Sequence, residues 1–222
     1  MRTAGKYPVL DKTLEFARHV RSDESPFTAL GNVTTGGSVF LGPDDWIING
    51  PMTIDRKVYL FGRGSTIEME AGVLGNSDAM ISINASDVVI HRVKFTSENK
   101  TGRAIFINAD RIRITECEFD GFDVGVFVSQ SSFCKITDNT FTNCGSYGIF
   151  VNRSVGCAIQ DNFVTDNPPD NGIFMDATTS NSLVTGNILP TGSIEYTHNS
   201  TNQPDTAARA GFTNVANSIT VN

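Results

Sequence analysis

Short apolar runs recur along residues 103–189 at a nearly constant step. Equivalent phenylalanines in the clearest run are 21, 23 and 24 positions apart. The four copies are Ala104-Ile105-Phe106-Ile107, Gly125-Val126-Phe127-Val128, Gly148-Ile149-Phe150-Val151 and Gly172-Ile173-Phe174-Met175. Self-similarity with a period of roughly 20–50 residues is typical of stacked-repeat proteins. We therefore interpret this stretch as a series of repeated coils.

Each copy continues with a second short run, a polar turn and a large apolar residue. The second runs are Ile112-Arg113-Ile114-Thr115, Cys134-Lys135-Ile136-Thr137, Cys157-Ala158-Ile159-Gln160 and Ser182-Leu183-Val184-Thr185. Their alternation has the period of two that is typical of β-strands, and no helical pattern separates them. The pattern predicts an all-β solenoid in which each coil contributes two or three short strands.

The apolar residues before the repeats follow a different spacing. Leu10, Leu14, Ala17 and Val20 would line one face of a helix, and Asp11 stands where an N-cap could be. The open end of a solenoid exposes its core and its strand edges, so it requires a cap. We predict that a helix over residues 7–21 is this cap and that residues 22–37 form a loop.

These patterns divide the chain into three parts. Residues 1–35 form the cap helix and its loop, residues 36–190 form the solenoid, and residues 191–222 form a polar tail. Within the tail, Gly192-Ser193-Ile194-Glu195-Tyr196 imitates the first strand of one more coil. The tail could close the last coil or pair with a partner.

A more specific pattern opens the solenoid. Its runs are Gly36-Gly37-Ser38-Val39-Phe40-Leu41-Gly42-Pro43, then Trp46-Ile47-Ile48-Asn49, Pro51-Met52-Thr53-Ile54 and Val58-Tyr59-Leu60-Phe61-Gly62-Arg63-Gly64-Ser65-Thr66-Ile67. This segment resembles the first coil of the pectate-lyase-like right-handed parallel β-helices, most of all those of bacteriophage tail spikes and tail fibres. The resemblance covers about residues 10–190 and implies a single-stranded right-handed parallel β-helix of about six or seven coils.

Composition narrows the range of partners. Charged residues make up 18% of the chain, and the formal net charge is −7 without any block of like charges. Nucleic acid would be met by clustered Lys and Arg, so we expect no nucleic-acid partner. No apolar stretch approaches the roughly 20 residues that cross a bilayer, and no signal-peptide pattern opens the sequence. We expect a protein made in a host cytoplasm, without a membrane partner.

Four cysteines are present, and two of them occupy equivalent positions. Cys134 and Cys157 are 23 residues apart and should stack in neighbouring coils, while Cys117 takes the place that Asn holds in later coils. A disulfide or a metal site is one interpretation, but no CxxC spacing supports it. Free cysteine is often buried, so we interpret these residues as small apolar core residues.

Two polar rows lie side by side in the turns. Asn139, Asn162 and Asn187 share one register, and we interpret them as a structural ladder whose members adopt the left-handed turn conformation. The residues just before the first two are Asp138 and Asp161, with Glu116 one coil earlier.

Stacked carboxylates could bind Ca²⁺ or form the acid/base pair of a glycosidase. The favoured interpretation is a solvated turn, so we predict no catalytic residue, no metal and no cofactor. Ca²⁺ binding and catalysis by these three residues stay as the alternatives.

The phenylalanine row is the most informative feature. Phe106, Phe127, Phe150 and Phe174 alternate with aliphatic residues and share their parity with small residues before them and polar residues after them. Aliphatic residues belong inside a coil, so parity predicts that the four rings face outward. The alternative is that the row fills the core. An exposed aromatic stripe normally marks an interface or a ligand groove.

We expect a non-catalytic virion structural or adhesin-type protein of a phage tail, fibre or spike, assembled as a homotrimer along this row. Other virion proteins and a cell-surface polysaccharide are the further partners that we expect. The alternative is a polysaccharide lyase or glycoside hydrolase with Glu116, Asp138 and Asp161 as its candidate catalytic residues. The N-T-D, D-D, G-H-G and R-I-K motifs of polygalacturonase-like members are missing, and Arg111-Ile112-Arg113 is their nearest fragment.

Overall fold

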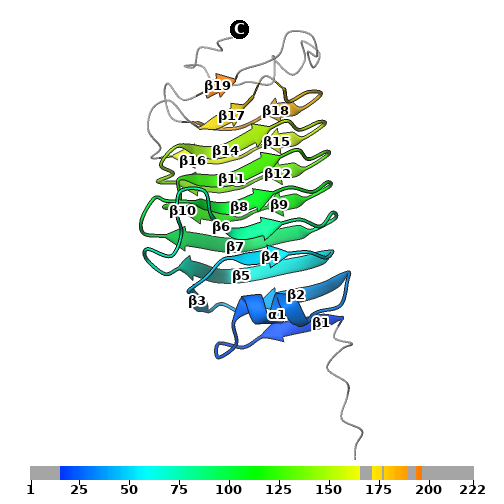
Figure 1. The fold of residues 1–222 in the computed structure, drawn as a ribbon, viewed down its shortest axis with the longest axis vertical. Coiled ribbons are helices and arrows are strands. Elements are labelled where there is room, and N and C mark those ends of the chain that lie inside the picture. The colour runs from blue at the N-terminus through cyan, green and yellow to red at the C-terminus, as the bar shows by residue number, and fades with distance from the viewer. Residues whose placement is uncertain (1–15, 166–171, 177, 190–193, 197–222) are drawn as a thin grey trace, which may run out of the picture.

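All the strand pairings among the residues that the structure describes are parallel, and they join each coil to the next. The computed structural model describes residues 16–165, 172–176, 178–189 and 194–196. Within these residues the coils stack along one axis, from β1 and α1 at one end to β19 at the other (Figure 1). The predicted all-β solenoid is confirmed.

One wall of the stack is a seven-stranded sheet with one strand from each coil. Its strands are β4 (Met52–Ile54), β6 (Ala79–Ile83), β8 (Arg103–Ile107), β11 (Val124–Ser129), β14 (Tyr147–Asn152), β17 (Ile173–Met175) and β19 (Ile194–Tyr196). The register aligns Phe106 with Phe127, Phe150 and Phe174, as the repeats predict. β19 pairs with β17 as a further first strand, which the end of the Gly192–Tyr196 run also predicted.

The remaining walls belong to one twelve-stranded sheet. Its strands are β1 (Ala17–Val20), β2 (Gly37–Leu41), β3 (Asp45–Ile48), β5 (Val58–Met69), β7 (Val89–Ser97), β9 (Arg113–Thr115), β10 (Glu118–Asp120), β12 (Lys135–Thr137), β13 (Thr140–Thr142), β15 (Ala158–Gln160), β16 (Phe163–Thr165) and β18 (Leu183–Thr185). In the early coils β5 and β7 run through both walls, whereas later coils break into two short strands. Each break falls at a residue with positive φ: Glu116, Asp138 or Asp161.

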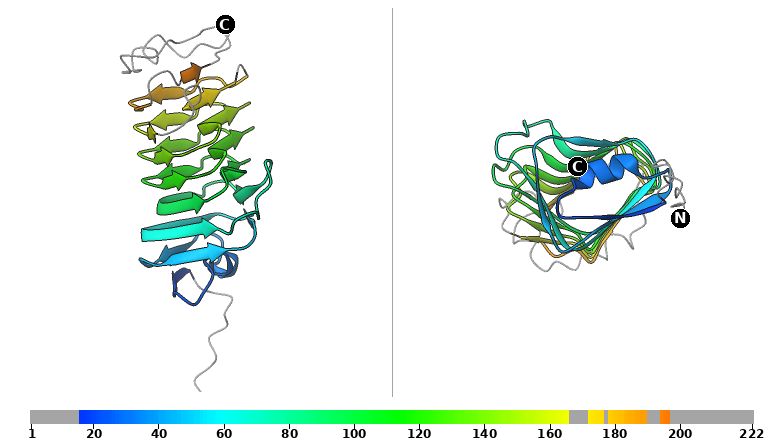
Figure 2. Two further views of the ribbon diagram at one scale, coloured as in Figure 1. Left: turned by 90° about the vertical axis from the view of Figure 1, so that its left-hand side faces the viewer. Right: turned by 90° about the horizontal axis from the view of Figure 1, so that it is seen from below.

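The core is built from rows of identical or similar residues, one from each coil. The inner face of the seven-stranded sheet supplies fully buried aliphatic residues such as Ile105, Val126 and Ile149. Phe95, Phe119 and Phe141 line up inside the opposite corner, with ring centroids 5.3 and 4.8 Å apart. Because every coil encloses the same interior (Figure 2, right), a side chain mainly contacts its equivalents in the adjacent coils.

The predicted cap helix over residues 7–21 is wrong where it can be compared. Ala17–Val20 is β1, which pairs in register with β2, and residues 7–15 lie outside the described part of the chain. The pairing surface of β2 outweighs the weak helical spacing of this segment, because tertiary contacts routinely override local propensity.

The helix lies instead in the predicted loop, as α1 (Pro26–Asn32). Ser25 is its N-cap, and its hydroxyl oxygen accepts a hydrogen bond of 3.3 Å from the amide of Phe27. Pro26 fits the first turn, where its missing amide hydrogen has no role. Ala29 and Leu30 are buried, and the helix lies across the N-terminal end of the stack (Figure 2, right). A cap helix is therefore present, but other residues form it.

Candidate functional site

Phe106, Phe127, Phe150 and Phe174 form a stack on the outside of the seven-stranded sheet, which we call the aromatic stripe. All four rings are partly exposed, while their neighbours Ile105 and Ile107 are fully buried. Ring centroids of successive members are 5.5, 4.7 and 4.8 Å apart. The outward orientation predicted from parity is therefore what the structure shows.

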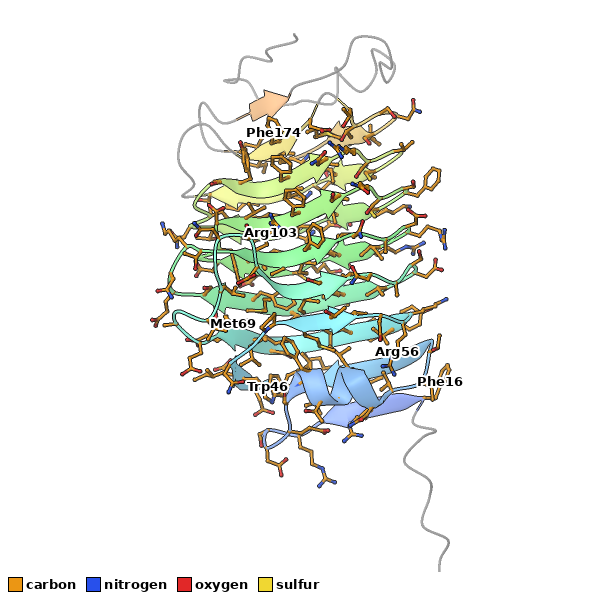
Figure 3. All side chains as sticks on the ribbon, viewed as in Figure 1. Phe16, Trp46, Arg56, Met69, Arg103 and Phe174 are labelled. Atoms are coloured by element: carbon orange, nitrogen blue, oxygen red, sulfur yellow. The ribbon has the colours of Figure 1, made fainter. Side chains whose placement is uncertain are left out.

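Two side chains at the start of these strands cover part of the aromatic stripe. The guanidinium of Arg103 lies 5.3 Å from the ring centroid of Phe106 and 4.5 Å from that of Phe127, which is cation–π geometry. Tyr147 contacts Phe150 and Phe174, with centroids 5.1 and 5.4 Å apart. Figure 3 shows Arg103 and Phe174 on the same face of the stack. Six side chains thus make one continuous surface of ring faces and a cation.

The small residues that precede each phenylalanine point inward, which corrects the expectation that they share its outward parity. Ala104 is fully buried. A Cβ atom at Gly125 would lie 2.4 Å from Cδ1 of Phe141, and one at Gly148 would lie 3.1 Å from Cγ1 of Val164. Two successive residues of the strand, such as Ala104 and Ile105, are therefore both buried. Only a small residue leaves room for the inner phenylalanines at this corner.

Asn139, Asn162 and Asn187 form a buried, hydrogen-bonded row in the twelve-stranded sheet. They lie where one short strand of a coil ends, as between β12 and β13 or between β15 and β16, and Asn187 follows β18. The side-chain amide of Asn139 donates to Oδ1 of Asn162 at 3.0 Å, and that of Asn162 donates to Oδ1 of Asn187 at 2.9 Å. Each Oδ1 also accepts from a backbone amide of the previous coil, as Asn139 does from Cys117 at 2.9 Å. These contacts satisfy polar groups that burial would otherwise leave unpaired.

The left-handed conformation expected for this asparagine row belongs to the residue before it. φ is +52° at Glu116, +58° at Asp138 and +53° at Asp161. The asparagines are needed for their buried amide groups, and the carboxylate residues make the turn. Asp tolerates positive φ better than most residues because its short polar side chain can hydrogen-bond locally.

Glu116, Asp138 and Asp161 are exposed at these turns, one coil apart. Glu116 is paired with Arg92 of the previous coil, with its Oε2 2.6 Å from Nε. Among the residues that the structure describes, no group of three or more His, Cys, Asp or Glu side chains could hold a metal ion. The three carboxylates are therefore accessible to solvent at separate turns of the stack.

All four cysteines are free and buried. Burial raises the pKa of Cys117 and that of Cys144 to about 12. The hydrogen bond with Cys157 in the next coil and burial together raise the pKa of Cys134. The thiols of Cys117, Cys134 and Cys144 therefore react slowly at neutral pH, because the nucleophilic form is the thiolate. The interpretation of the cysteines as core residues agrees with this geometry.

A second exposed aromatic row was missed in the sequence. His19, Phe40 and Phe61 stack on the outside of the twelve-stranded sheet, with ring centroids 5.0 and 5.3 Å apart, and His91 meets Phe61 edge to face at 6.1 Å. His19, Phe40 and Phe61 follow one another at a constant step of 21, and Phe40 and Phe61 share the outward parity of their strands. The step from Phe61 to His91 is 30, so the row departs from the regular spacing there.

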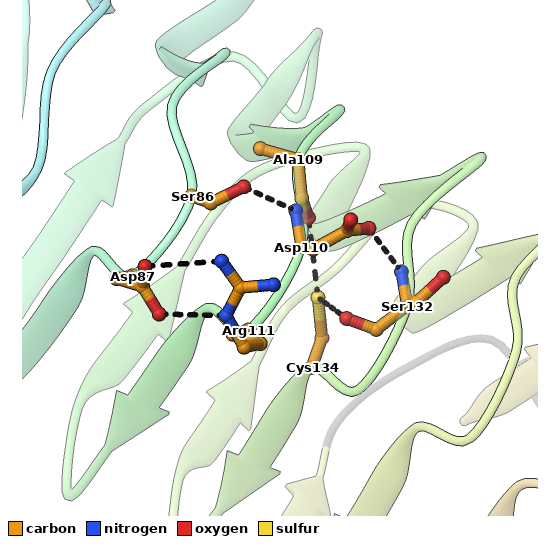
Figure 4. A network of polar contacts seen from close by, with 7 residues as sticks. All are labelled: Ser86, Asp87, Ala109, Asp110, Arg111, Ser132 and Cys134. Carbon is orange, nitrogen blue, oxygen red and sulfur yellow. Dashed lines mark hydrogen bonds and ion pairs between the residues drawn. The ribbon is translucent and has the colours of Figure 1, made fainter.

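A groove of about 390 Å³ lies on the same sheet, beside this row. Its lining side chains come from successive coils: Lys57, Tyr59, Asp87, Val89, Arg111, Arg113, Phe133 and Lys135. Arg111 and Asp87 form a bidentate ion pair, in which Nε donates to Oδ1 at 2.8 Å and Nη2 donates to Oδ2 at 3.1 Å (Figure 4). That hydrogen bond lowers the pKa of Asp87, so the pair is charged over the whole physiological range. Four lining side chains are cations, namely Lys57, Arg111, Arg113 and Lys135, and Asp87 is the one carboxylate among them. The groove is therefore cationic, although the net charge of the protein is −7.

A continuous stack of parallel coils, filled by aliphatic rows and an asparagine row, defines a right-handed parallel β-helix. Comparison with protein families agrees: the model of the right-handed β-helix region matches residues 55–189. The chain belongs to this family. No curated protein gave a significant match. No helix in the described part of the chain is long and apolar enough to cross a membrane.

Proposed function

We propose that this chain is a non-catalytic β-helix protein of the virion-structural or adhesin type, working as an oligomer joined along the aromatic stripe. The observation that carries the proposal is the position of the four stacked rings of the aromatic stripe on the outside of the fold. Solvated aromatic rings in a continuous row are costly to leave in water and mark interaction surfaces. A two- or three-fold axis parallel to the stack would bring equivalent rows together.

The size of the aromatic stripe fits the centre of an interface. A fully covered Phe side chain buries about 150–250 Å², and these rings are already partly covered. Stable interfaces bury about 800 Å² per partner, with an apolar centre and a polar rim. Asn108, Ser129 and Asn152 follow the phenylalanines on the same face and supply such a rim.

The virion setting is supported by the opening coil. β2, β3, β4 and β5 form where the runs that resemble phage tail-spike and tail-fibre β-helices predict them. In this setting the protein is a homotrimer in a virion, and its further partners are other virion proteins or a polysaccharide on a cell surface.

The second candidate is a polysaccharide lyase or glycoside hydrolase. Asp138 and Asp161 lie on neighbouring coils, whose strands are about 4.8 Å apart, close to the roughly 5–5.5 Å that retaining glycosidases use. Catalysis also needs a concave site that excludes water, and these residues are exposed to solvent. We therefore rank this candidate second.

The test is the double variant Phe127→Ser, Phe150→Ser, measured by light scattering after size exclusion and by circular dichroism. We expect a folded monomer from a wild-type trimer. Phe163→Ser is the matched control, because Phe163 is 44% exposed on another wall and its loss should leave the trimer intact. A double variant that stays trimeric, or a wild type that is monomeric, overturns the proposal.

A further inference from the structure

Two cations lie directly against each other on the outside of the twelve-stranded sheet. The register pairs Val89 with Arg113, Arg113 with Lys135, and Lys135 with Ala158. Arg113 and Lys135 are exposed and face the same way, about 4.8 Å apart along the stack. Like charges directly opposite each other on neighbouring strands destabilise a sheet. Neither cation has an ion pair with any described residue.

Elsewhere in the same stack, cations are matched with carboxylates of the adjacent coil. Arg92 pairs with Glu116 at 2.6 Å, Arg111 with Asp87 at 2.8 Å, and Lys94 with Glu118 at 3.9 Å. These pairs show how this fold neutralises charge between coils. The Arg113–Lys135 neighbours depart from that arrangement, because neither cation forms an ion pair with a carboxylate of the described residues. Both charges are therefore available to an anionic ligand.

Both cations line the cationic groove, and a third joins them. Lys57 lies over the ring of Tyr59, with its Nζ 5.5 Å from the centroid. The only carboxylate among the groove's lining residues is Asp87, which Arg111 already neutralises (Figure 4). Lys57, Arg113 and Lys135 therefore give the groove an excess of positive charge.

An exposed aromatic ring stands at the edge of the groove. Phe133 is 61% exposed and its φ is +59°, a conformation that is rare for a bulky residue. A Cβ atom at Gly156 in the next coil would lie 2.8 Å from the Phe133 ring, so only glycine leaves room for it. Strained residues that persist are often found at binding sites. The ring is a flat apolar wall beside the cations.

We propose that this groove is a binding site for an anionic saccharide, one that carries carboxylate or sulfate groups. The Arg113 guanidinium and the Lys135 ammonium bind two oxyanion groups, and Phe133 and Tyr59 contact the apolar faces of the sugar rings. A volume of about 390 Å³ suits a short oligosaccharide. A long phosphate backbone would extend beyond the groove over a protein of net charge −7, which disfavours nucleic acid. This proposal does not rest on the aromatic stripe or on the oligomeric state.

The experiment is isothermal titration calorimetry of the full chain with four probes at low ionic strength. The probes are a tetragalacturonate, a heparin-derived tetrasaccharide, neutral maltotetraose and an oligothymidylate of eight nucleotides. We expect one or both acidic tetrasaccharides to bind and maltotetraose not to bind; the pattern between the first two identifies carboxylate or sulfate as the favoured group. Binding of neither acidic probe at millimolar concentration, or tighter binding of the oligothymidylate, overturns the proposal.

Variants locate the site. Arg113→Gln with Lys135→Gln should weaken binding about tenfold or more, because hydrogen bonds to charged groups are the strong ones. Arg92→Gln with Lys94→Gln removes the same net charge from the same sheet outside the groove, and we expect less than a threefold change. Phe133→Ala should weaken binding several-fold. Equal losses in the two double variants would show a non-specific charge effect and contradict the proposal. Thermal melts confirm folding, and relief of the Arg113–Lys135 repulsion should leave that variant as stable as the wild type.

Discussion

Two of the phenylalanine stacks in the β-helix have nearly the same ring geometry and opposite environments. In the inner stack, Phe119 and Phe141 lie 4.8 Å apart, with 1% and 0% of their surface exposed. In the outer stack, Phe127 and Phe150 lie 4.7 Å apart and are partly exposed. Stacking between coils therefore forms wherever the repeat places aromatic rings in register, whichever way they face.

The difference lies in what else touches the rings. The inner rings pack against aliphatic residues and against the glycine row, where a Cβ atom at Gly125 would collide with Phe141. The outer rings contact one another, Arg103 and Tyr147, and leave the rest of their surface to the solvent or to a partner. The inner stack thus packs the core of the coil, while the outer stack keeps part of its ring surface exposed.

The largest effect should come from the inner stack. Phe141→Ala should lower the free energy of unfolding by about 3–5 kcal/mol, because it removes a fully buried ring and leaves a cavity. Phe127→Ala should cost about 1 kcal/mol in the protomer, since its ring is partly exposed. Urea denaturation followed by circular dichroism, performed where the protein is monomeric, measures both values. Equal losses for the two variants would remove the distinction between the stacks.

The asparagine row gives the next largest effect. Asn162→Ala leaves the backbone amide of Asn139 without its buried acceptor, and an unsatisfied buried group costs about 1–3 kcal/mol. Asn108→Ala is the matched exterior control, because Asn108 is exposed on the other wall, and it should change stability by less than about 0.5 kcal/mol. The same urea titrations test both. A harmless Asn162→Ala would mean that water replaces the lost oxygen.

The smallest effect should come from the turn carboxylates. Changing Glu116, Asp138 and Asp161 together to Asn should cost less than about 1 kcal/mol, because exposed charges contribute little and Asn tolerates positive φ. Asp138→Val should cost more than this triple change, since a β-branched residue is strained in the left-handed region. Thermal melts rank the two variants. Loss of a measurable glycan-cleaving activity in the triple variant would favour the enzyme candidate instead.

The repeated coils could be predicted because their signal is periodic and is set by packing. Every coil must close around the same interior, so the aliphatic residues of β8, β11 and β14 recur at fixed parity. Their parity determines that the Phe127 side chain faces outward. The different roles of the two neighbouring turn residues could not be predicted in the same way. Asp138 and Asn139 are both good turn residues, and only the fold decides which one takes positive φ and which one is buried.

The missed features depend on contacts between segments that no local pattern encodes. Ala17–Val20 became a strand because β2 offers it a pairing edge, and Pro26–Asn32 is too short for a helical period to emerge. The groove of Arg113 and Lys135 joins residues from four coils, two of which belong to the irregular part of the repeat. A search for unmatched charges at equivalent repeat positions would have found the Arg113–Lys135 pair.

The parallel register also sets how such a protein can change its length during evolution. Ser129 and Asn152 are register partners 23 positions apart, so a deletion of residues 129–151 would join Val128 to Asn152 with every remaining side chain on its original face. A duplication of the same segment would add one coil and extend the stack by about 4.8 Å. Insertions of any other size would have to be absorbed in a loop. The length of the β-helix can therefore change by whole coils. Each such duplication would add one ring to the inner stack and one to the outer stack.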